Sequence, residues 1–304
     1  MPEIKKGENV TLGKIVQPSK YPRIIYELRP NISVYFQNGL VEINNQGWRT
    51  KEPALKKEKN TVRIIGLGDS FMFGQGVNQN KDWITILEDK LNTQFPQKKW
   101  EVINTAVPGY NTFMEVETLF QKALIYGPDI TIIEYIGNDF DLPNFIYDSA
   151  DDYLDLKKSF LTDLIFERYK LLRQSFKLID APLKKDVQYF RFENDPQKVP
   201  PQYKDMVGWE SYFKAMVKLH KLQMVNKFDV ISVLTINYSD AKVFNLSRRL
   251  GFYVTYNKAF NPNDLSLVLS KDDNHYSELE HKKTAEAILD FMVESKIIDK
   301  YLHK

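Results

Sequence analysis

The sequence contains no cysteine. This absence excludes disulfide bonds, thiolate metal sites and cysteine nucleophiles together. The chain also carries little net charge, because 42 Lys and Arg residues are balanced by 40 Asp and Glu residues, which leaves a formal charge of +2. A chain so close to neutral gives no reason to expect a nucleic acid or an anionic membrane surface as its partner.

Long apolar runs are missing as well. No stretch approaches the roughly 18 apolar residues that a membrane-spanning helix needs, and the opening residues MPEIKKGENV have no apolar signal core. We therefore expect the chain as given to be soluble. A signal or membrane anchor upstream of Met1 in the natural protein stays open as an alternative, and with it the localisation.

What the sequence does contain is enough apolar material for a folded core. Apolar residues make up 43% of its 304 positions, and aromatic residues make up 13%. At this length the chain can form one large α/β domain, or one domain with an added elaboration.

The first part of the chain, residues 1–60, lacks the pattern of a strand followed by a helix. Apolar and polar residues alternate over 32–36, and Asn38-Gly39 separates this run from a second extended run. Asn-Gly between two such runs is typical of a β-hairpin. We predict that residues 1–60 form a hairpin arm packed on the main domain.

The main domain is predicted to cover residues 61–304, after a charged linker at 51–59. The arm ends in an aromatic residue, Trp48, and a basic residue, Arg49. The simplest interpretation is that they only pack, and the alternative is that one of them borders a functional site.

From residue 62 onward, buried strands and amphipathic helices alternate. The run 130–136 is almost continuously apolar and rich in β-branched residues, as a parallel strand covered on both faces should be. This alternation predicts a three-layer α/β/α sandwich around a parallel sheet. An insertion at about 140–227 interrupts it, with helical spacing over 151–180. The predicted strands are 62–68, 100–104, 130–136, 228–236 and 252–255, and the predicted helices are 82–95, 113–126, 209–226, 240–250 and 277–295.

Polar residues follow several of these strands, where ligands of open α/β sheets collect. The stretch TVRIIGLGDSFMFGQGV ends a strand in Ser70, a candidate nucleophile. It is not the GxSxG elbow, because Met72 stands where the second glycine would be. His275 precedes the last helix and is a candidate base, with Asp272 and Asp273 just before it as groups that could orient it.

Acyl transfer by a serine also needs donors for the oxyanion. The Ser70 amide, the Gly109 amide and the Asn138 side chain are the candidates, since Gly109 and Asn138 follow the next two strands. Glycine lets the backbone approach a ligand closely, and asparagine offers an uncharged NH₂ donor. Asp69 is expected to be structural, through bonds to local backbone amides.

These residues resemble the blocks of the SGNH, or GDSL-type, serine hydrolases. The resemblance implies a flavodoxin-like sheet, a serine nucleophile, a histidine base and a Ser/Gly/Asn oxyanion hole. The family's usual DxxH pair selects Asp272, whereas the D-x-H spacing of some carbohydrate O-acetyltransferase relatives selects Asp273, and both are kept. The four blocks read Gly68-Asp69-Ser70, Pro108-Gly109, Gly137-Asn138-Asp139 and Asp272-Asp273-Asn274-His275.

The sequence therefore predicts a serine esterase that hydrolyses O-acyl esters, preferably O-acetyl esters and also those of carbohydrates. One alternative is an O-acyltransferase acting on a cell-envelope or secreted polysaccharide, and a second is a non-catalytic carbohydrate-binding module. The expected partner is a small-molecule or carbohydrate ester, and the oligomeric state stays open. No cofactor is expected, and no metal either, because His281 lies six residues after His275 and does not share its helix face.

Overall fold

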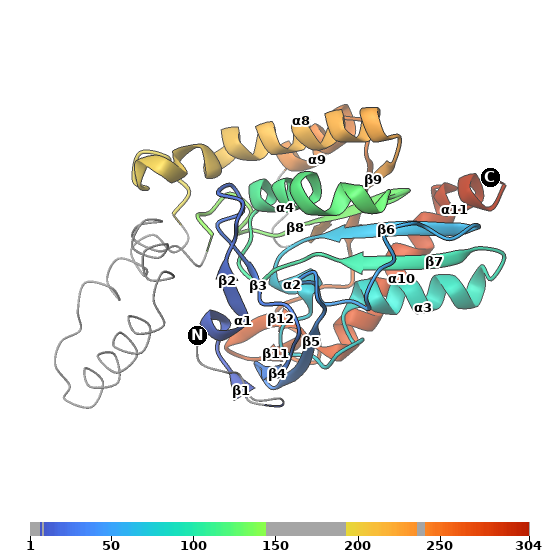
Figure 1. Cartoon of the computed structure of the whole chain (residues 1–304), viewed down its shortest axis with the longest axis horizontal. Coiled ribbons are helices and arrows are strands. Elements are labelled where there is room, and N and C mark those ends of the chain that lie inside the picture. The colour runs from blue at the N-terminus through green and yellow to red at the C-terminus, as the bar shows by residue number, and fades with distance from the viewer. Residues whose placement is uncertain (1–6, 8, 144–192, 236–240, 304) are drawn as a thin grey trace.

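The computed structural model of the chain describes residues 7, 9–143, 193–235 and 241–303 (Figure 1). The helix expected over 151–180 lies outside the described residues, as do Ile236 at the end of one predicted strand and Asp240 at the start of one predicted helix. The rest of the predicted α/β pattern can be compared with the structure directly.

The centre of the molecule is a sheet of five parallel strands in the order β10-β9-β8-β6-β7. Within this sheet β6 is the first strand along the chain, and β7 follows it at the outer side of the sheet. The chain then crosses back to the other side of β6, where it forms β8. Sheets with such a reversal bind their ligands at the carboxyl ends of the strands on either side of it, which here are β6 and β8. The strands are β6 (Thr61–Leu67), β7 (Lys99–Asn104), β8 (Ile130–Tyr135), β9 (Asp229–Thr235) and β10 (Tyr253–Asn257).

Helices cover both faces of this sheet, so every residue of β6, β8 and β9 is buried. Figure 1 shows α4, α8 and α9 on one face and α3 and α10 on the other. The three-layer α/β/α fold expected from the sequence is confirmed. The helices are α3 (Trp83–Gln94), α4 (Thr112–Thr118), α8 (Gly208–Asn226), α9 (Ala241–Arg249), α10 (Glu278–Glu294) and α11 (Ile297–Leu302). None of the described helices has the length and the hydropathy to cross a membrane.

The structure differs locally from the prediction in the kind of helix formed over 113–126 and in the stretch before His275. The helix expected over 113–126 is α-helical only through α4, and continues as a π turn, Leu119–Ala123, and a 3₁₀ turn, Leu124–Tyr126. The stretch before His275 was expected to be a loop, but it forms an antiparallel pair of β11 (Val268–Ser270) and β12 (Asp273–Tyr276). Polar β12 shows no alternation of apolar residues, so only its partner strand reveals it.

The N-terminal segment, described at residues 7 and 9–60, forms two small sheets whose apolar side chains share one core with the main sheet. Strand β4 (Ile32–Phe36) pairs with β5 (Gly39–Ile43) as the expected hairpin, but the turn residues are Gln37 and Asn38, with φ of 52° and 68°. Gly39 instead opens β5, because a Cβ atom there would lie 2.3 Å from the Val77 carbonyl oxygen. The other elements of the segment are β1 (Asn9–Val10), α1 (Leu12–Ile15), β2 (Val16–Pro18) and β3 (Tyr26–Leu28). The division of the chain at residue 60 stays a prediction.

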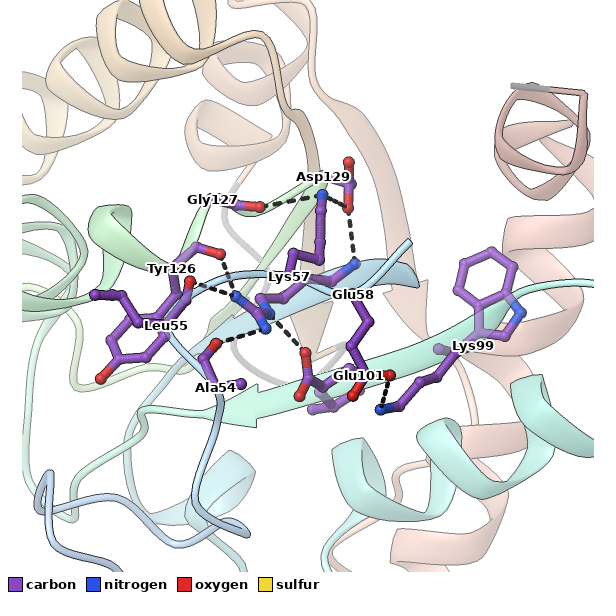
Figure 2. A network of polar contacts seen from close by, with 12 residues as sticks. Ala54, Leu55, Lys57, Glu58, Lys99, Glu101, Tyr126, Gly127 and Asp129 are labelled. Atoms are coloured by element: carbon purple, nitrogen blue, oxygen red, sulfur yellow. Dashed lines mark hydrogen bonds and ion pairs between the residues drawn. The ribbon is translucent and has the colours of Figure 1, made fainter. Parts of the chain in front are cut away.

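The charged linker is tied to the amino ends of the central strands (Figure 2). Arg63, only 1% exposed, donates to the Ala54 carbonyl at 2.8 Å, and its Nε is 2.6 Å from Glu101 Oε2. Lys57 Nζ lies 2.5 Å from Asp129 Oδ2. A buried guanidinium needs such partners, so the linker carbonyls hold Arg63 at the amino end of the sheet, opposite to the end that carries Ser70.

Candidate active site

Ser70 lies directly after β6, at the first position of the one-turn helix α2 (Ser70–Phe73). Asp69 caps this helix, because its Oδ1 accepts the Phe71 backbone N–H at 3.0 Å. The structural role expected for Asp69 is thus present. Ser70 is 7% exposed, so most of its surface is covered by neighbouring residues.

His275 reaches Ser70 from strand β12, which the β11–β12 pairing holds in place. Its Nε2 lies 2.7 Å from Ser70 Oγ, and its Nδ1 lies 2.6 Å from Asp273 Oδ1. A carboxylate at Nδ1 selects the tautomer with its proton on that nitrogen, which leaves Nε2 to accept the serine proton. Asp69 Oδ2 is also near Ser70 Oγ, at 3.5 Å, but the shorter contact to His275 is the stronger one.

The two aspartates before His275 have different surroundings. Asp273 Oδ1 accepts both the imidazole and the His275 backbone N–H, the latter at 3.1 Å. The hydrogen bond to His275 holds the pKa of Asp273 below its ordinary value, although partial burial acts in the opposite direction. Asp272 is exposed and lies outside this chain of hydrogen bonds. The contact therefore has the D-x-H spacing.

The Phe71 ring packs against the imidazole of His275 and against the ring of Tyr276. The Phe71 ring centroid is 4.9 Å from that of His275 and 4.8 Å from that of Tyr276. The Tyr276 hydroxyl donates to Glu134 Oε1 at 3.0 Å, which anchors the end of β12 to strand β8. Packing and hydrogen bonding together leave the imidazole few alternatives to its orientation toward Ser70.

The two remaining oxyanion candidates lie at the ends of the neighbouring strands. Asn138 follows β8, and its Nδ2 donates to Asp69 Oδ2 at 2.9 Å, which fixes the side-chain amide beside the Ser70 turn. Gly109 lies in a buried turn after β7, with φ of 80°, and the Val107 N–H of this turn donates to the Gly68 carbonyl at 3.2 Å. Ser70, Gly109 and Asn138 thus follow the carboxyl ends of three adjacent strands of the sheet.

A group of buried carboxyls beneath this edge was not anticipated. Burial raises the pKa of Glu134 and of Asp139 to about 8 each, and raises that of Asp69. Burial also raises the pKa of Glu115 well above its ordinary value, and the charge of Asp139 adds to this. With a pKa of about 8, Glu134 and Asp139 hold a proton at neutral pH and add no negative charge near a developing oxyanion. The signal in the sequence was Glu134 itself, an acid in the middle of an apolar strand.

Glu134 leads to a prediction about pH. Its pKa is about 8 in the folded chain and about 4.5 without burial, so between these values the folded protein holds a proton that the unfolded chain has lost. Its contribution to the free energy of unfolding is therefore full below about pH 4.5 and falls by up to about 1.4 kcal/mol per pH unit as pH rises to about 8. We expect Glu134→Gln to flatten this fall in urea titrations between about pH 5 and pH 8.

The matched control is Glu286→Gln, which removes a carboxylate that is 59% exposed and paired with Lys90. It should leave the pH dependence of wild type in place. If Glu134→Gln kept the wild-type slope, Glu134 would be ionised in the folded protein.

His281 is buried apart from the Ser70 site. Its Nδ1 accepts the Trp83 N–H at 3.1 Å, at the start of α3, and burial lowers the pKa of His281 to about 3, so it stays neutral at ordinary pH. In the described part of the chain, no group of three or more His, Asp or Glu residues is placed to hold a metal ion.

Residues 64–288 match the family model described as GDSL-like Lipase/Acylhydrolase. No curated protein matches the chain significantly.

Three solved structures are similar to this chain at low sequence identity. A putative lipolytic protein of the G-D-S-L family from Desulfitobacterium hafniense DCB-2 has 13% identity and a TM-score of 0.45, over 76% of this chain and 99% of that one. A psychrotrophic esterase from Pseudoalteromonas sp. has 18% identity and a TM-score of 0.42, over 81% and 100%. A two-domain esterase active on acetylated mannans has 14% identity and a TM-score of 0.45, over 80% and 50%.

Proposed function

The chain belongs to the GDSL-like lipase/acylhydrolase family of ester-hydrolysing enzymes, and from this membership we propose that it is a serine esterase that removes O-acetyl groups, including those on carbohydrates, through an acyl-enzyme on Ser70. The observation that carries the proposal is the continuous chain of contacts from Asp273 through His275 to Ser70, at 2.6 and 2.7 Å. This is the arrangement that a serine needs to act as a nucleophile.

In the proposed reaction, Ser70 Oγ attacks the ester carbonyl carbon while His275 Nε2 takes the hydroxyl proton. The imidazolium is stabilised by the Asp273 carboxylate at Nδ1. The carbonyl oxygen becomes an oxyanion and accepts hydrogen bonds from the Ser70 and Gly109 amides and the Asn138 side chain. Collapse expels the alcohol, which receives the proton from His275, and water then repeats the sequence on the acyl-enzyme to release the acid.

Asn138→Ala tests the oxyanion part of this proposal. Removing one preorganised donor costs about 3 kcal/mol of transition-state stabilisation, so we expect kcat for p-nitrophenyl acetate to fall about 100-fold with little change in KM. The control is Asn92→Ala, which removes an amide that donates to the Trp100 carbonyl at 2.8 Å on strand β7. If both variants lost the same activity, the effect of Asn138 would be structural.

A second candidate function is transfer of the acyl group to a sugar hydroxyl. The D-x-H spacing of the Asp273–His275 contact favours it, because some carbohydrate O-acetyltransferase relatives use this pair. The same acyl-enzyme would serve both reactions, and only the acceptor would differ. The non-catalytic alternative is opposed by the intact chain of contacts at Ser70, and labelling of Ser70 by a fluorophosphonate would exclude it.

The acyl group and the acceptor can be tested together. A panel of p-nitrophenyl esters of increasing chain length and a set of acetylated oligosaccharides, each with Ser70→Ala as the control, should show the fastest hydrolysis for acetyl esters. Faster hydrolysis of long acyl chains would contradict the acetyl assignment. Adding free oligosaccharide to the acetyl donor should leave free acetate as the main product, and acetylated sugar as the main product would favour the transferase.

A further inference from the structure

Arg49, in the N-terminal segment, is completely buried against the loop that follows Ser70. Its Nη1 donates to the Phe73 and Gly74 carbonyls at 2.9 and 2.6 Å, and its Nη2 donates to the Val77 carbonyl at 2.8 Å. The first two carbonyls end the one-turn helix that begins at Ser70. The guanidinium therefore holds the far end of the turn that carries the nucleophile.

The same loop touches the strand pair that carries His275. Gln75 donates its backbone N–H to the Ser70 carbonyl at 3.0 Å, and its side-chain Nε2 lies 3.4 Å from His275 Nδ1. Gly76 packs so closely on β11 that a Cβ atom there would lie 2.2 Å from Leu269 Cδ1. A shift of this loop would therefore move Ser70 and His275 relative to each other.

A second contact from the segment reaches the Gly109 turn. The Tyr26 hydroxyl, on β3, donates to the Pro108 carbonyl at 3.1 Å, and the Tyr110 hydroxyl donates back to the Tyr26 carbonyl. The two rings meet edge to face, with centroids 5.2 Å apart. Gly109 lies between the two bonded residues, so its amide is held from both sides by β3.

Tyr26 and Arg49 both precede residue 64, where the match to the family begins. We propose that the N-terminal segment completes the active site. Arg49 positions the loop after Ser70, residues 73–77, and Tyr26 positions the turn at Gly109. Both are positioning residues, because they act through the loops that they hold. The proposal deepens the proposed serine esterase and rests on it.

The chemistry of the guanidinium explains why a side chain that only packs could not hold the loop after Ser70 in the same way. A guanidinium is planar and presents five N–H donors in a fixed geometry, so it can hold several carbonyls at once, whereas a lysine ammonium is a point charge on a flexible stem. Arg49 also donates from Nε to Gln79 Oε1 at 3.1 Å. Misplacing a catalytic group by about 1 Å can lower a rate about 100-fold.

The experiment compares each positioning variant with a matched variant at the opposite edge of the sheet. Arg49→Lys is paired with Arg63→Lys, since both arginines are buried and both donate to carbonyls. Tyr26→Phe is paired with Tyr301→Phe, whose hydroxyl donates to the Asp129 carbonyl at 2.6 Å at the start of β8. For each, kcat and KM for p-nitrophenyl acetate, the rate of fluorophosphonate labelling at Ser70 and the melting temperature are measured.

We expect Arg49→Lys to lower kcat and the labelling rate about 100-fold, and Tyr26→Phe to lower kcat about 10-fold, with KM changed less than about threefold. The two control variants should melt earlier than wild type but keep kcat within about twofold. Tyr26→Phe removes a single oxygen atom. If Arg49→Lys does not fold, this variant alone tests whether the N-terminal segment positions the active site.

The inference is overturned if the positioning variants and their controls lose melting temperature alike while kcat stays within about twofold of wild type. Labelling of Ser70 in all of them would then leave the proposed esterase intact. No labelling of Ser70 in wild type would instead overturn the proposed function, and with it this inference.

Discussion

Ser70→Ala is expected to lower kcat for p-nitrophenyl acetate by about 10⁵-fold or more, because alanine has no oxygen with which to form the acyl-enzyme. Serine nucleophiles act as a unit with their base, so their loss removes nearly all chemistry beyond the contribution of the oxyanion donors and binding. The change removes one oxygen atom, which hydrogen-bonds to the side chains of His275 and Asp69 at 2.7 and 3.5 Å, so we expect the variant to fold as wild type does.

The matched control is Ser232→Ala. Ser232 is also buried, on strand β9, where its hydroxyl lies 3.2 Å from Ser247 Oγ. This variant should lose some stability and keep kcat. The measurement is steady-state hydrolysis with the melting temperature of each variant beside it. Activity of Ser70→Ala within tenfold of wild type would show that the ester is attacked by another group.

Asp273→Asn is expected to lower kcat between about 10² and 10⁴-fold, whereas Asp272→Asn should stay within about twofold of wild type. Only the Asp273 carboxylate contacts the imidazole, so only its neutralisation removes the charge that stabilises the imidazolium and selects its tautomer. Asparagine has nearly the shape of aspartate, which keeps strand β12 in place in both variants.

This pair of variants separates the two spacings that the sequence left open. Asp272 ends the turn between β11 and β12, Asp273 begins β12, and both changes remove one negative charge, so nonspecific charge effects should be similar. The measurement is kcat for p-nitrophenyl acetate of both variants at several pH values. A larger loss in Asp272→Asn would mean that the DxxH pair operates, and that the β11–β12 pairing rearranges when substrate binds.

The elements that sequence alone predicts well are those with a strong local signal. Strand β8 is an almost continuously apolar run, and helix α10 is capped by Ser277, whose Oγ accepts the Glu280 N–H. Because parallel strands end at the same edge of a sheet, the order of Ser70, Gly109 and Asn138 along the chain was enough to place them near one another.

The elements that sequence alone missed depend on partners far along the chain. Strand β12 is polar and exists through its pairing with β11, so the contacting aspartate could not be chosen from spacing. The hairpin turn lies one residue before the expected Asn-Gly, because Gly39 is needed where β5 approaches Val77. The contacts of Arg49 join residues 24 to 28 positions apart, and no periodic pattern encodes them.

The most direct test of the account is a search for the acyl-enzyme itself. The protein is mixed with p-nitrophenyl acetate, quenched in acid within the first turnovers, digested and analysed by mass spectrometry, with Ser70→Ala treated in parallel. If hydrolysis passes through an acyl-enzyme on Ser70, we expect a burst of p-nitrophenol and an acetyl group on Ser70 that is absent from the variant. Continued turnover with no acetyl group on Ser70 at any quench time, or an acetylated residue elsewhere that forms and decays at the rate of turnover, would contradict it.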